Sequence, residues 1–252
     1  IMIENQRFLC QDTMENYIGQ RVKAYYKETT DGENQLVYVD NSKMEIISAN
    51  AENIVDSGDG VVRIEQENGK ERRLRLNPIL SLIYNGKQKP FSPELLQVDA
   101  GNFLFIDHEE DGRIDVIVAT VYETIVVDSV SSSDYTVTDR LSAMRIELDS
   151  ESSEYDVYIS DGGAVRDFSS FSVGQILFYA ASQGEGRNVK NVLISNATAV
   201  GTIAELREDT VLLSSGEIFK ASPAFLSHAA VGAEGTFYLD PSQRMVYAEY
   251  GQ

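Results

Sequence analysis

The sequence predicts an all-β protein built from tandem small barrels of the SH3-like or OB-like kind, joined by short connecting helices. A strand-and-turn unit led by glycine recurs four times along the 252 residues. Elsewhere apolar and polar side chains alternate with a period of two, which is typical of half-buried strands. Helical signals are few and short. These three observations indicate packed sheets throughout the chain.

The recurring unit is a glycine followed by an aromatic-rich run, a polar turn and a second apolar run. Its copies begin at Gly19, Gly101, Gly174 and Gly232. Each copy predicts a β-hairpin, and the irregular spacing between copies indicates diverged repeats with loop insertions rather than a strict solenoid. A hairpin and three further strands make about five strands per repeat, which is the number in a small barrel.

Further strands and tight turns are expected between these hairpins. Strands are predicted at residues 125–130 and 200–206, and short hairpins at 157–159 turning through 161–163 and at 211–213 turning into 218–219. Helical connectors are expected at residues 8–17, 93–96 and 222–230, which start at Ser or Pro or end near a glycine that leads a hairpin.

One further hairpin has a predicted register. Residues 61–65 and 72–76 flank the dipeptide Asn68-Gly69, which favours a type I′ turn with a two-residue loop. With that loop, Glu65 would face Arg72 across the two strands. Opposite charges in register support the pairing, although an exposed pair contributes only about 0.2–1 kcal/mol.

The repeats predict four segments of chain. Residues 1–18 are expected to form a connector or the end of a preceding unit, followed by β unit 1 (19–99) and β unit 2 (100–172). Residues 173–252 are expected to form β unit 3, closed by the C-terminal hairpin, which has no following strands of its own. No Pro-rich or Ser-rich linker separates the units, so we expect them to pack against one another, and we expect the chain to be part of something longer.

The charge balance narrows the expected partners. Forty acidic residues against 21 basic residues give a net charge of −19, which repels nucleic-acid phosphates and anionic lipids. No apolar run is long enough to span a bilayer as a helix, so we expect no membrane insertion. The single cysteine, Cys10, excludes an internal disulfide and is expected to be a small buried residue. The partners expected are other protein subunits or domains of the same assembly.

One loop has the spacing of a metal site. Oxygen-bearing side chains alternate at Asp107, Glu109, Asp111 and Asp115, with Gly112 at the sharp turn and the carbonyl of Arg113 as a further oxygen. Calcium takes six to eight such oxygen ligands. The loop resembles the calcium loop of integrin-type propeller repeats, whereas Val118 stands where an EF-hand has its bidentate glutamate. The alternative is an acidic turn whose residues serve backbone geometry alone.

Catalytic motifs do not stand out in the sequence. The two histidines, His108 and His228, have no second histidine or cysteine near them in the chain, and no nucleophile elbow or phosphate-binding glycine loop is present. Paired carboxylates carry little information in so acidic a chain. We therefore expect a protein that is not an enzyme.

Part of the chain resembles a known class of repeats. The resemblance is carried by residues 82–86, 100–101, 106–107, 111–112, 115–118 and 122–127. These resemble β-rich repeat regions of large surface proteins of Gram-positive bacteria, including those with S-layer homology modules, and repeats in virion structural proteins of phages. No S-layer anchoring motif is visible, so cell-wall attachment is not implied.

The resemblance implies a structural role. We expect a stalk, spacer or docking segment of a large bacterial cell-surface protein, located outside the cell or in its envelope. The alternatives are a phage tail or baseplate component, located in the virion, and an accessory region of a secreted hydrolase.

Overall fold

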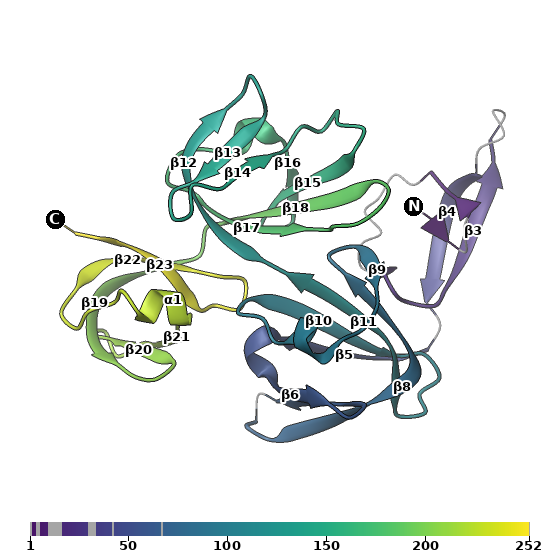
Figure 1. Cartoon of the computed structure of the whole chain (residues 1–252), viewed down its shortest axis with the longest axis horizontal. Helices are drawn as coiled ribbons and strands as arrows, with labels where there is room; N and C mark the ends of the chain where they lie inside the picture. Colours follow the sequence, from purple (N-terminus) through teal and green to yellow (C-terminus); the bar gives the residue numbers. More distant parts are fainter. Residues whose placement is uncertain are drawn as a thin grey trace. The chain divides into compact units, whose positions relative to one another are not determined.

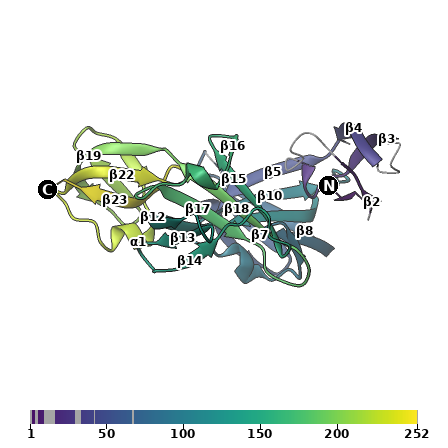
Figure 2. The ribbon, with the colours of Figure 1, turned by 90° about the horizontal axis from the view of Figure 1, so that it is seen from above.

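A computed structural model describes residues 2–3, 6–9, 17–29, 34–41, 43–66 and 68–251. These residues are predominantly strand, with helices no longer than four residues, so the all-β prediction is confirmed. The sheets curl rather than lie flat (Figure 1, Figure 2). The chain divides into two compact units, unit 1 (Ile1–Thr120) and unit 2 (Val121–Gln252).

The described residues of unit 1 form two small antiparallel pairs and one larger sheet. The small pairs are β1 (Met2–Ile3) with β2 (Gln6–Arg7), and β3 (Val22–Glu28) with β4 (Asn34–Asn41). The larger sheet consists of β5 (Glu45–Asn50), β6 (Ile54–Gly58), β7 (Val61–Glu65), β8 (Glu71–Tyr84), β9 (Lys87–Lys89), β10 (Gly101–Asp107) and β11 (Arg113–Val121). Its order is β5-β10-β11-β8-β7-β6, with β9 paired to β8.

Unit 2 contains two sheets. The first consists of β12 (Glu123–Ser131), β13 (Thr136–Asp139), β14 (Arg145–Glu147), β15 (Tyr155–Asp161), β16 (Ala164–Arg166), β17 (Ile176–Ala181) and β18 (Asn188–Ser195), in the order β14-β13-β12-β17-β18-β15-β16. The second consists of β19 (Thr198–Leu206), β20 (Thr210–Leu213), β21 (Ile218–Lys220), β22 (Glu234–Leu239) and β23 (Met245–Tyr250), in the order β21-β20-β19-β22-β23.

The three larger sheets share one connectivity. In each, the first strand pairs antiparallel with the first strand of the glycine-led hairpin: β5 with β10, β12 with β17, and β19 with β22. The second strand of the hairpin meets an earlier strand in parallel. These parallel contacts are β8 with β11, β15 with β18, and the bridge between Ala221 and Met245 at the start of β23.

Short helical turns precede the glycine-led hairpins, as expected for two of the three predicted connectors. They are η3 (Pro93–Leu96), η4 (Phe168–Ser170) and α1 (Pro223–Leu226), in addition to η2 (Ala51–Asn53) between β5 and β6. Ser222 caps α1 by accepting a hydrogen bond from the backbone N–H of Phe225. The connector expected at residues 8–17 lies largely outside the described residues.

All four glycine-led hairpins form as predicted. They are β3–β4, β10–β11, β17–β18 and β22–β23. Gly19, Gly174 and Gly232 each have a positive φ, of 75°, 86° and 86°. Each is the third residue of a four-residue turn closed by a backbone hydrogen bond, from Gln20 to Tyr17, from Gln175 to Ser172 and from Ala233 to Ala230. A positive φ at that position favours glycine, which explains the residue type that leads these three copies, whereas Gly101 is the first residue of β10.

The register predicted for the hairpin at Asn68-Gly69 is wrong by one residue. Glu65 lies opposite Glu71, and Arg72 lies opposite Ile64. The loop is longer than two residues, because the N–H of Gln66 donates to the carbonyl of Lys70 and the loop closes there. A slip of one residue moves every side chain to the other face. The short hairpins predicted at 157–159 turning through 161–163 and at 211–213 turning into 218–219 are confirmed as β15–β16 and β20–β21.

The sheets extend across the predicted domain limits. The limits at 99/100 and 172/173 place each glycine-led hairpin at the start of a unit, whereas β10–β11 and β17–β18 share sheets with the strands that precede them. The sequence suggested that the last hairpin completes the sheet formed by the strands before it. All three hairpins of the larger sheets do so. As limits of independently folding domains, 1–18, 19–99, 100–172 and 173–252 stay predictions.

Aliphatic and aromatic side chains fill the inside of each curled sheet. In unit 2, one cluster gathers around Val127, Val137 and Leu177 and a second around Val211, Phe237 and Met245, all buried. In the larger sheet of unit 1 and the turn η3 beside it, Leu82, Phe103, Phe105 and Ile117 of the sheet and Leu96 of η3 have no exposed surface. Burial of this kind supplies the main favourable term in folding.

Candidate functional site

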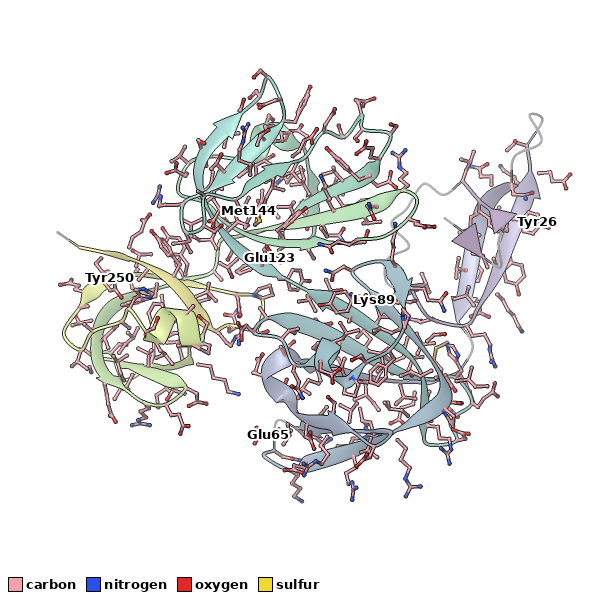
Figure 3. All side chains as sticks on the ribbon, viewed as in Figure 1. Tyr26, Glu65, Lys89, Glu123, Met144 and Tyr250 are labelled. Carbon is pink, nitrogen blue, oxygen red and sulfur yellow. The ribbon has the colours of Figure 1, made fainter. Side chains whose placement is uncertain are left out.

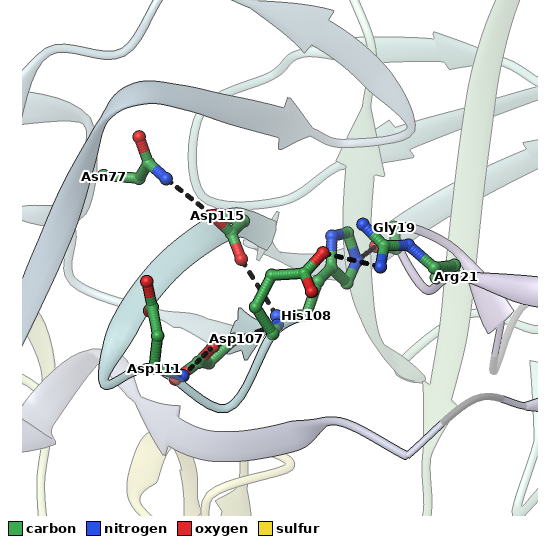
Figure 4. A network of polar contacts seen from close by, with 8 residues as sticks. Gly19, Arg21, Asn77, Asp107, His108, Asp111 and Asp115 are labelled. Atoms are coloured by element: carbon green, nitrogen blue, oxygen red, sulfur yellow. Dashed lines mark hydrogen bonds and ion pairs between the residues drawn. The ribbon is translucent and has the colours of Figure 1, made fainter.

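The predicted metal residues lie on one turn, residues 107–115, which we call the acidic loop. Asp107 ends β10, and Arg113 begins β11. Glu110 and Gly112 have positive φ values of 54° and 81°, which turn the chain sharply between the two strands. Figure 4 shows the polar contacts of the loop.

Asp107 is the centre of the acidic loop. Its side chain is buried, with 1% of the residue exposed. One carboxylate oxygen, Oδ1, accepts hydrogen bonds from the backbone N–H groups of Glu109 and Asp111, both at 3.2 Å. The other, Oδ2, accepts one from Gly112 at 2.7 Å. The carboxylate therefore satisfies three backbone N–H donors of the turn that follows it.

Two further aspartates of the loop also accept backbone hydrogen bonds. Asp115 Oδ2 accepts from the N–H of His108 at 2.9 Å, and its Oδ1 accepts from the side-chain amide of Asn77 at 2.8 Å. Asp111 Oδ1 accepts from the N–H of Arg113 at 2.9 Å. Asp107, Asp111 and Asp115 thus each accept hydrogen bonds from backbone N–H groups of the loop.

The remaining polar side chains join the acidic loop to the segment before β3. His108 Nε2 lies 2.9 Å from the carbonyl oxygen of Gly19. Since a carbonyl can only accept, this nitrogen carries the proton. Glu109 forms an ion pair with Arg21 at 2.7 Å, and both side chains are more than half exposed. The loop is therefore a junction between the larger sheet of unit 1 and the β3–β4 hairpin.

The arrangement of the acidic loop does not require a cation. In the described part of the chain, no group of three or more His, Cys, Asp and Glu side chains is placed to hold a metal ion. The backbone donors already supply the positive partial charges that the carboxylates face. Calcium binding by Asp107, Glu109, Asp111, Arg113 and Asp115 stays a prediction.

Buried acceptors occupy the same place in two other glycine-led hairpins. Asp240 follows β22, is 2% exposed, and accepts from the N–H groups of Ser242 and Arg244 and from Arg244 Nε, each at 2.9 Å. Ser182 follows β17, and its Oγ accepts from the N–H of Val189 at 2.7 Å. Sequence reasoning missed these two residues, although a small polar residue directly after each aromatic run was a readable signal.

Asp139 plays a similar part at the end of β13. Its carboxylate accepts from the N–H of Val126 at 2.9 Å and from the N–H and hydroxyl of Ser142 at 2.8 and 2.7 Å. Burial raises the pKa of Asp139, but the hydrogen bonds from Ser142 and Val126 outweigh burial and hold the pKa below its usual value. The charged carboxylate thus stabilises the turn.

His228 and Lys190 each make local contacts. His228 follows α1, and its Nδ1 lies 2.9 Å from Ser227 Oγ and 3.0 Å from the carbonyl oxygen of Ala224. Cys10 lies outside the described residues. Lys190 Nζ sits 3.3 Å from the centre of the Tyr155 ring and donates to the carbonyl of Glu147 at 2.7 Å. These contacts satisfy the side chains locally.

Unit 1 also has an open depression of about 410 Å³, lined mainly by Ile18, Ser81, Ile83, Gln88 and Val116. Its lining is largely apolar and includes no charged side chain. Such a surface offers packing area, and its lining includes no carboxylate, imidazole, thiol or amine side chain.

Comparison with known proteins found no matching protein family, no matching curated protein and no matching solved structure. Among the described residues, none of the helices has the length and apolar character needed to cross a membrane.

Proposed function

We propose that the chain is a non-catalytic segment of tandem OB-like barrels that serves as a stalk, spacer or docking segment of a large bacterial cell-surface protein. The observation that carries the proposal is the connectivity shared by the three larger sheets. Repeated small units of one design suit an architectural role, because each unit adds length and surface without adding a reaction centre.

The barrel assignment rests on how each sheet closes. The strand order β21-β20-β19-β22-β23 becomes a ring when its two end strands meet in parallel at Ala221 and Met245. A helical turn, α1, separates the third and fourth strands of this ring. Five strands in this Greek-key order with a connecting helix are the plan of an OB-like barrel. The other two sheets support the same plan, with one strand of each divided in two and one short strand, β9 or β16, added.

Contact between successive sheets supports a segment with limited freedom. Within unit 2, Val126, Ile176 and Phe178 of the first sheet pack against Tyr238 and Val246 of the second. Ser195 Oγ also donates to the carbonyl of Leu239 at 2.9 Å. An apolar junction resists bending between neighbours more than a free linker would. A spacer needs this property.

The location of the protein tests the proposal. Intact cells that produce the protein are labelled with an antibody raised against the chain, and purified phage particles are probed in parallel. We expect labelling of the cell surface, removed by prior absorption of the antibody with the protein. Labelling confined to phage particles would overturn the cell-surface role in favour of a virion component. A signal found only inside permeabilised cells would overturn both.

The hydrolase alternative has its own readout. Mass spectrometry of the polypeptide captured by the same antibody gives the sequence that accompanies the chain. We expect further repeats without catalytic motifs, whereas an adjoining hydrolase domain would make the chain an accessory region of that enzyme.

A further inference from the structure

Basic residues gather in one part of an otherwise acidic chain. Residues 61–89 hold seven of the 21 basic residues and only three of the 40 acidic residues. They form β7, β8 and β9 of the larger sheet of unit 1, where Figure 3 labels Glu65 on β7 and Lys89 on β9. The local charge of this segment is therefore opposite in sign to the net charge of the chain, which is −19.

Arginines lie side by side on the outer face of this sheet. On β8, Leu74 is buried, whereas its neighbours Arg73 and Arg75 are exposed and lie on the face away from the core. Arg63 on β7 lies opposite Arg73 in an antiparallel pair. Arg113 on β11 lies opposite Arg75 in a parallel pair. Because cross-strand partners share a face, the four arginines form one group across three strands, which we call the arginine face.

Three residues of the arginine face have no ion pair. Arg63 is paired with Asp56 at 2.8 Å. Arg73, Arg75 and Arg113 form no ion pair with any described residue, and all three are exposed. Every other arginine whose side chain the structure describes has an ion pair; these are Arg21, Arg63, Arg72, Arg140, Arg145, Arg166, Arg187, Arg207 and Arg244. Among the described side chains, free guanidinium groups are thus confined to this face.

This arrangement does not stabilise the sheet. Like charges directly opposite each other on neighbouring strands are destabilising, and Arg75 lies opposite Arg113 with neither side chain in an ion pair. A guanidinium group has five N–H donors in a planar fork that matches the two oxygens of a carboxylate. The three free guanidinium groups therefore offer their donors to a ligand rather than to the fold.

The spacing of the arginine face indicates the shape of the ligand. Arg73 and Arg75 are two residues apart on one strand, so their Cα atoms lie about 7 Å apart. An extended polypeptide with acidic residues at alternate positions repeats its carboxylates at the same interval. A long and evenly charged polyanion fits less well, because carboxylates border the face: Glu65 and Glu71 lie opposite each other on β7 and β8, and the acidic loop precedes β11.

We propose that the arginine face binds a short acidic segment of a second polypeptide, in extended conformation and with Asp or Glu at alternate positions. Arg73 and Arg75 each pair with one carboxylate of that segment, and Arg113 adds a third cation beside Arg75. This inference rests on the proposed function and deepens it, because it names the chemistry by which a docking segment would recognise its partner.

A synthetic peptide with the sequence of residues 147–151 serves as the probe, because its acidic residues, Glu147, Asp149 and Glu151, alternate. Its binding to the full chain is measured by fluorescence anisotropy of the labelled peptide in low and in high salt. We expect saturable binding that weakens as the salt concentration rises, because the contacts join exposed charges. A control peptide with Asp149→Asn and Glu151→Gln is expected to bind about tenfold more weakly.

Two double variants of the protein locate the binding. Arg73→Gln with Arg75→Gln is expected to weaken binding of the probe about tenfold. The matched control is Arg145→Gln with Arg187→Gln, which removes the same charge from arginines that already have ion pairs, and no change is expected. Because the control peptide leaves the protein unchanged, a folding defect of a variant cannot account for both losses.

Three results would overturn the proposal. Equal weakening in the two double variants would mean that the peptide responds to net charge alone. Absence of saturable binding would mean that the face takes no such segment. Displacement of the probe by polyphosphate at a lower concentration than by unlabelled peptide would assign the face to a phosphate polymer. Surface labelling can succeed while the peptide fails to bind, so this proposal and the proposed function fail separately.

Discussion

At the scale of single residues, buried carboxylates set the turns of this protein. Asp107, Asp139 and Asp240 are each at most 3% exposed, and each accepts hydrogen bonds from backbone N–H groups of its own turn. For the acidic loop the sequence predicted either a calcium site or an acidic turn. It could not predict which groups the carboxylates meet, because the same alternate spacing serves a cation and a row of backbone donors.

Substitution of Asp107 distinguishes these two roles. Asp107→Ala removes the acceptor for three backbone N–H groups, so we expect a loss of about 2–4 kcal/mol in the free energy of unfolding of unit 1. Asp111→Ala removes the acceptor for one exposed N–H, and about 0.5–1 kcal/mol is expected. Urea titrations with calcium and with chelator measure both. Equal losses in the two conditions are expected from a turn, whereas losses seen only with calcium would establish the metal site.

Tyr179 gives unit 2 a pH dependence in the alkaline range. Burial, with smaller effects from the charge of Glu123 and from Tyr155, raises the pKa of Tyr179 to about 12. The unfolded value is about 10, so this contribution to stability is complete below about pH 10 and is lost as the pH rises through about 12.

Two variants test this assignment. Tyr179→Phe is expected to remove this part of the alkaline loss of stability, and Glu123→Gln is expected to move it to lower pH. Thermal unfolding between neutral and alkaline pH, together with phenolate absorbance, measures both effects. An alkaline profile that Tyr179→Phe leaves unchanged would show that this phenol does not contribute.

At the scale of elements, the glycine-led hairpins were predictable because their signals are local. The positive φ of Gly19, Gly174 and Gly232 favours glycine, and the alternating runs that follow define the strands. The register at Asn68-Gly69 was not predictable in the same way, because it depends on where the loop closes. Opposite charges at Glu65 and Arg72 contribute too little to fix it against the packing of Val62 and Ile64, which are buried.

The turn at Gly19 provides a test of how the first hairpin meets the larger sheet of unit 1. A Cβ atom at Gly19 would lie 2.8 Å from Val118 Cγ2 and 3.0 Å from Val116 Cγ1. At Gly232, which has a similar positive φ, a Cβ atom would meet nothing within 4 Å. Both alanine variants carry the backbone cost of about 1–2 kcal/mol, and Gly19→Ala adds about 1–3 kcal/mol for overpacking.

We therefore expect Gly19→Ala to destabilise unit 1 more than Gly232→Ala destabilises unit 2. Amide hydrogen exchange of β11 in Gly19→Ala and of β23 in Gly232→Ala measures the two effects. Faster exchange of β11 in Gly19→Ala would show that the turn supports the sheet. Equal losses in the two variants would mean that Val116 and Val118 move aside at no cost, so that this contact contributes little.

At the scale of the whole molecule, sequence reasoning found the repeats but not how strands are shared among them. The partners of β10, β17 and β22 lie far back in the chain, at β5, β12 and β19, and no local signal specifies such distant pairing. Because the glycine that leads each hairpin is easy to recognise in the sequence, sequence reasoning placed a domain boundary before it. In the sheets it marks the strand that follows a short helical turn, β10, β17 or β22.

The apolar junction inside unit 2 makes a prediction about cooperativity. Val246 follows Met245, which points into the core of the second sheet, and packs with the group that contains Val126, Ile176 and Phe178. Val246→Asp places a charge against these fully buried side chains and is expected to weaken the junction by about 2–3 kcal/mol. Val200→Asp, on β19 of the same sheet at a residue that is 70% exposed, is the matched control.

Hydrogen exchange across unit 2 then separates two kinds of tandem protein. If the two sheets stabilise each other, Val246→Asp is expected to speed exchange in both sheets, at β12 and β17 as well as at β22 and β23, because stability lost at a shared surface is lost on both sides of it. The control variant Val200→Asp is expected to change exchange in neither sheet. If exchange rises only in β22 and β23, the two sheets are stable independently of each other. The restricted bending that a spacer requires would then have to come from outside this junction.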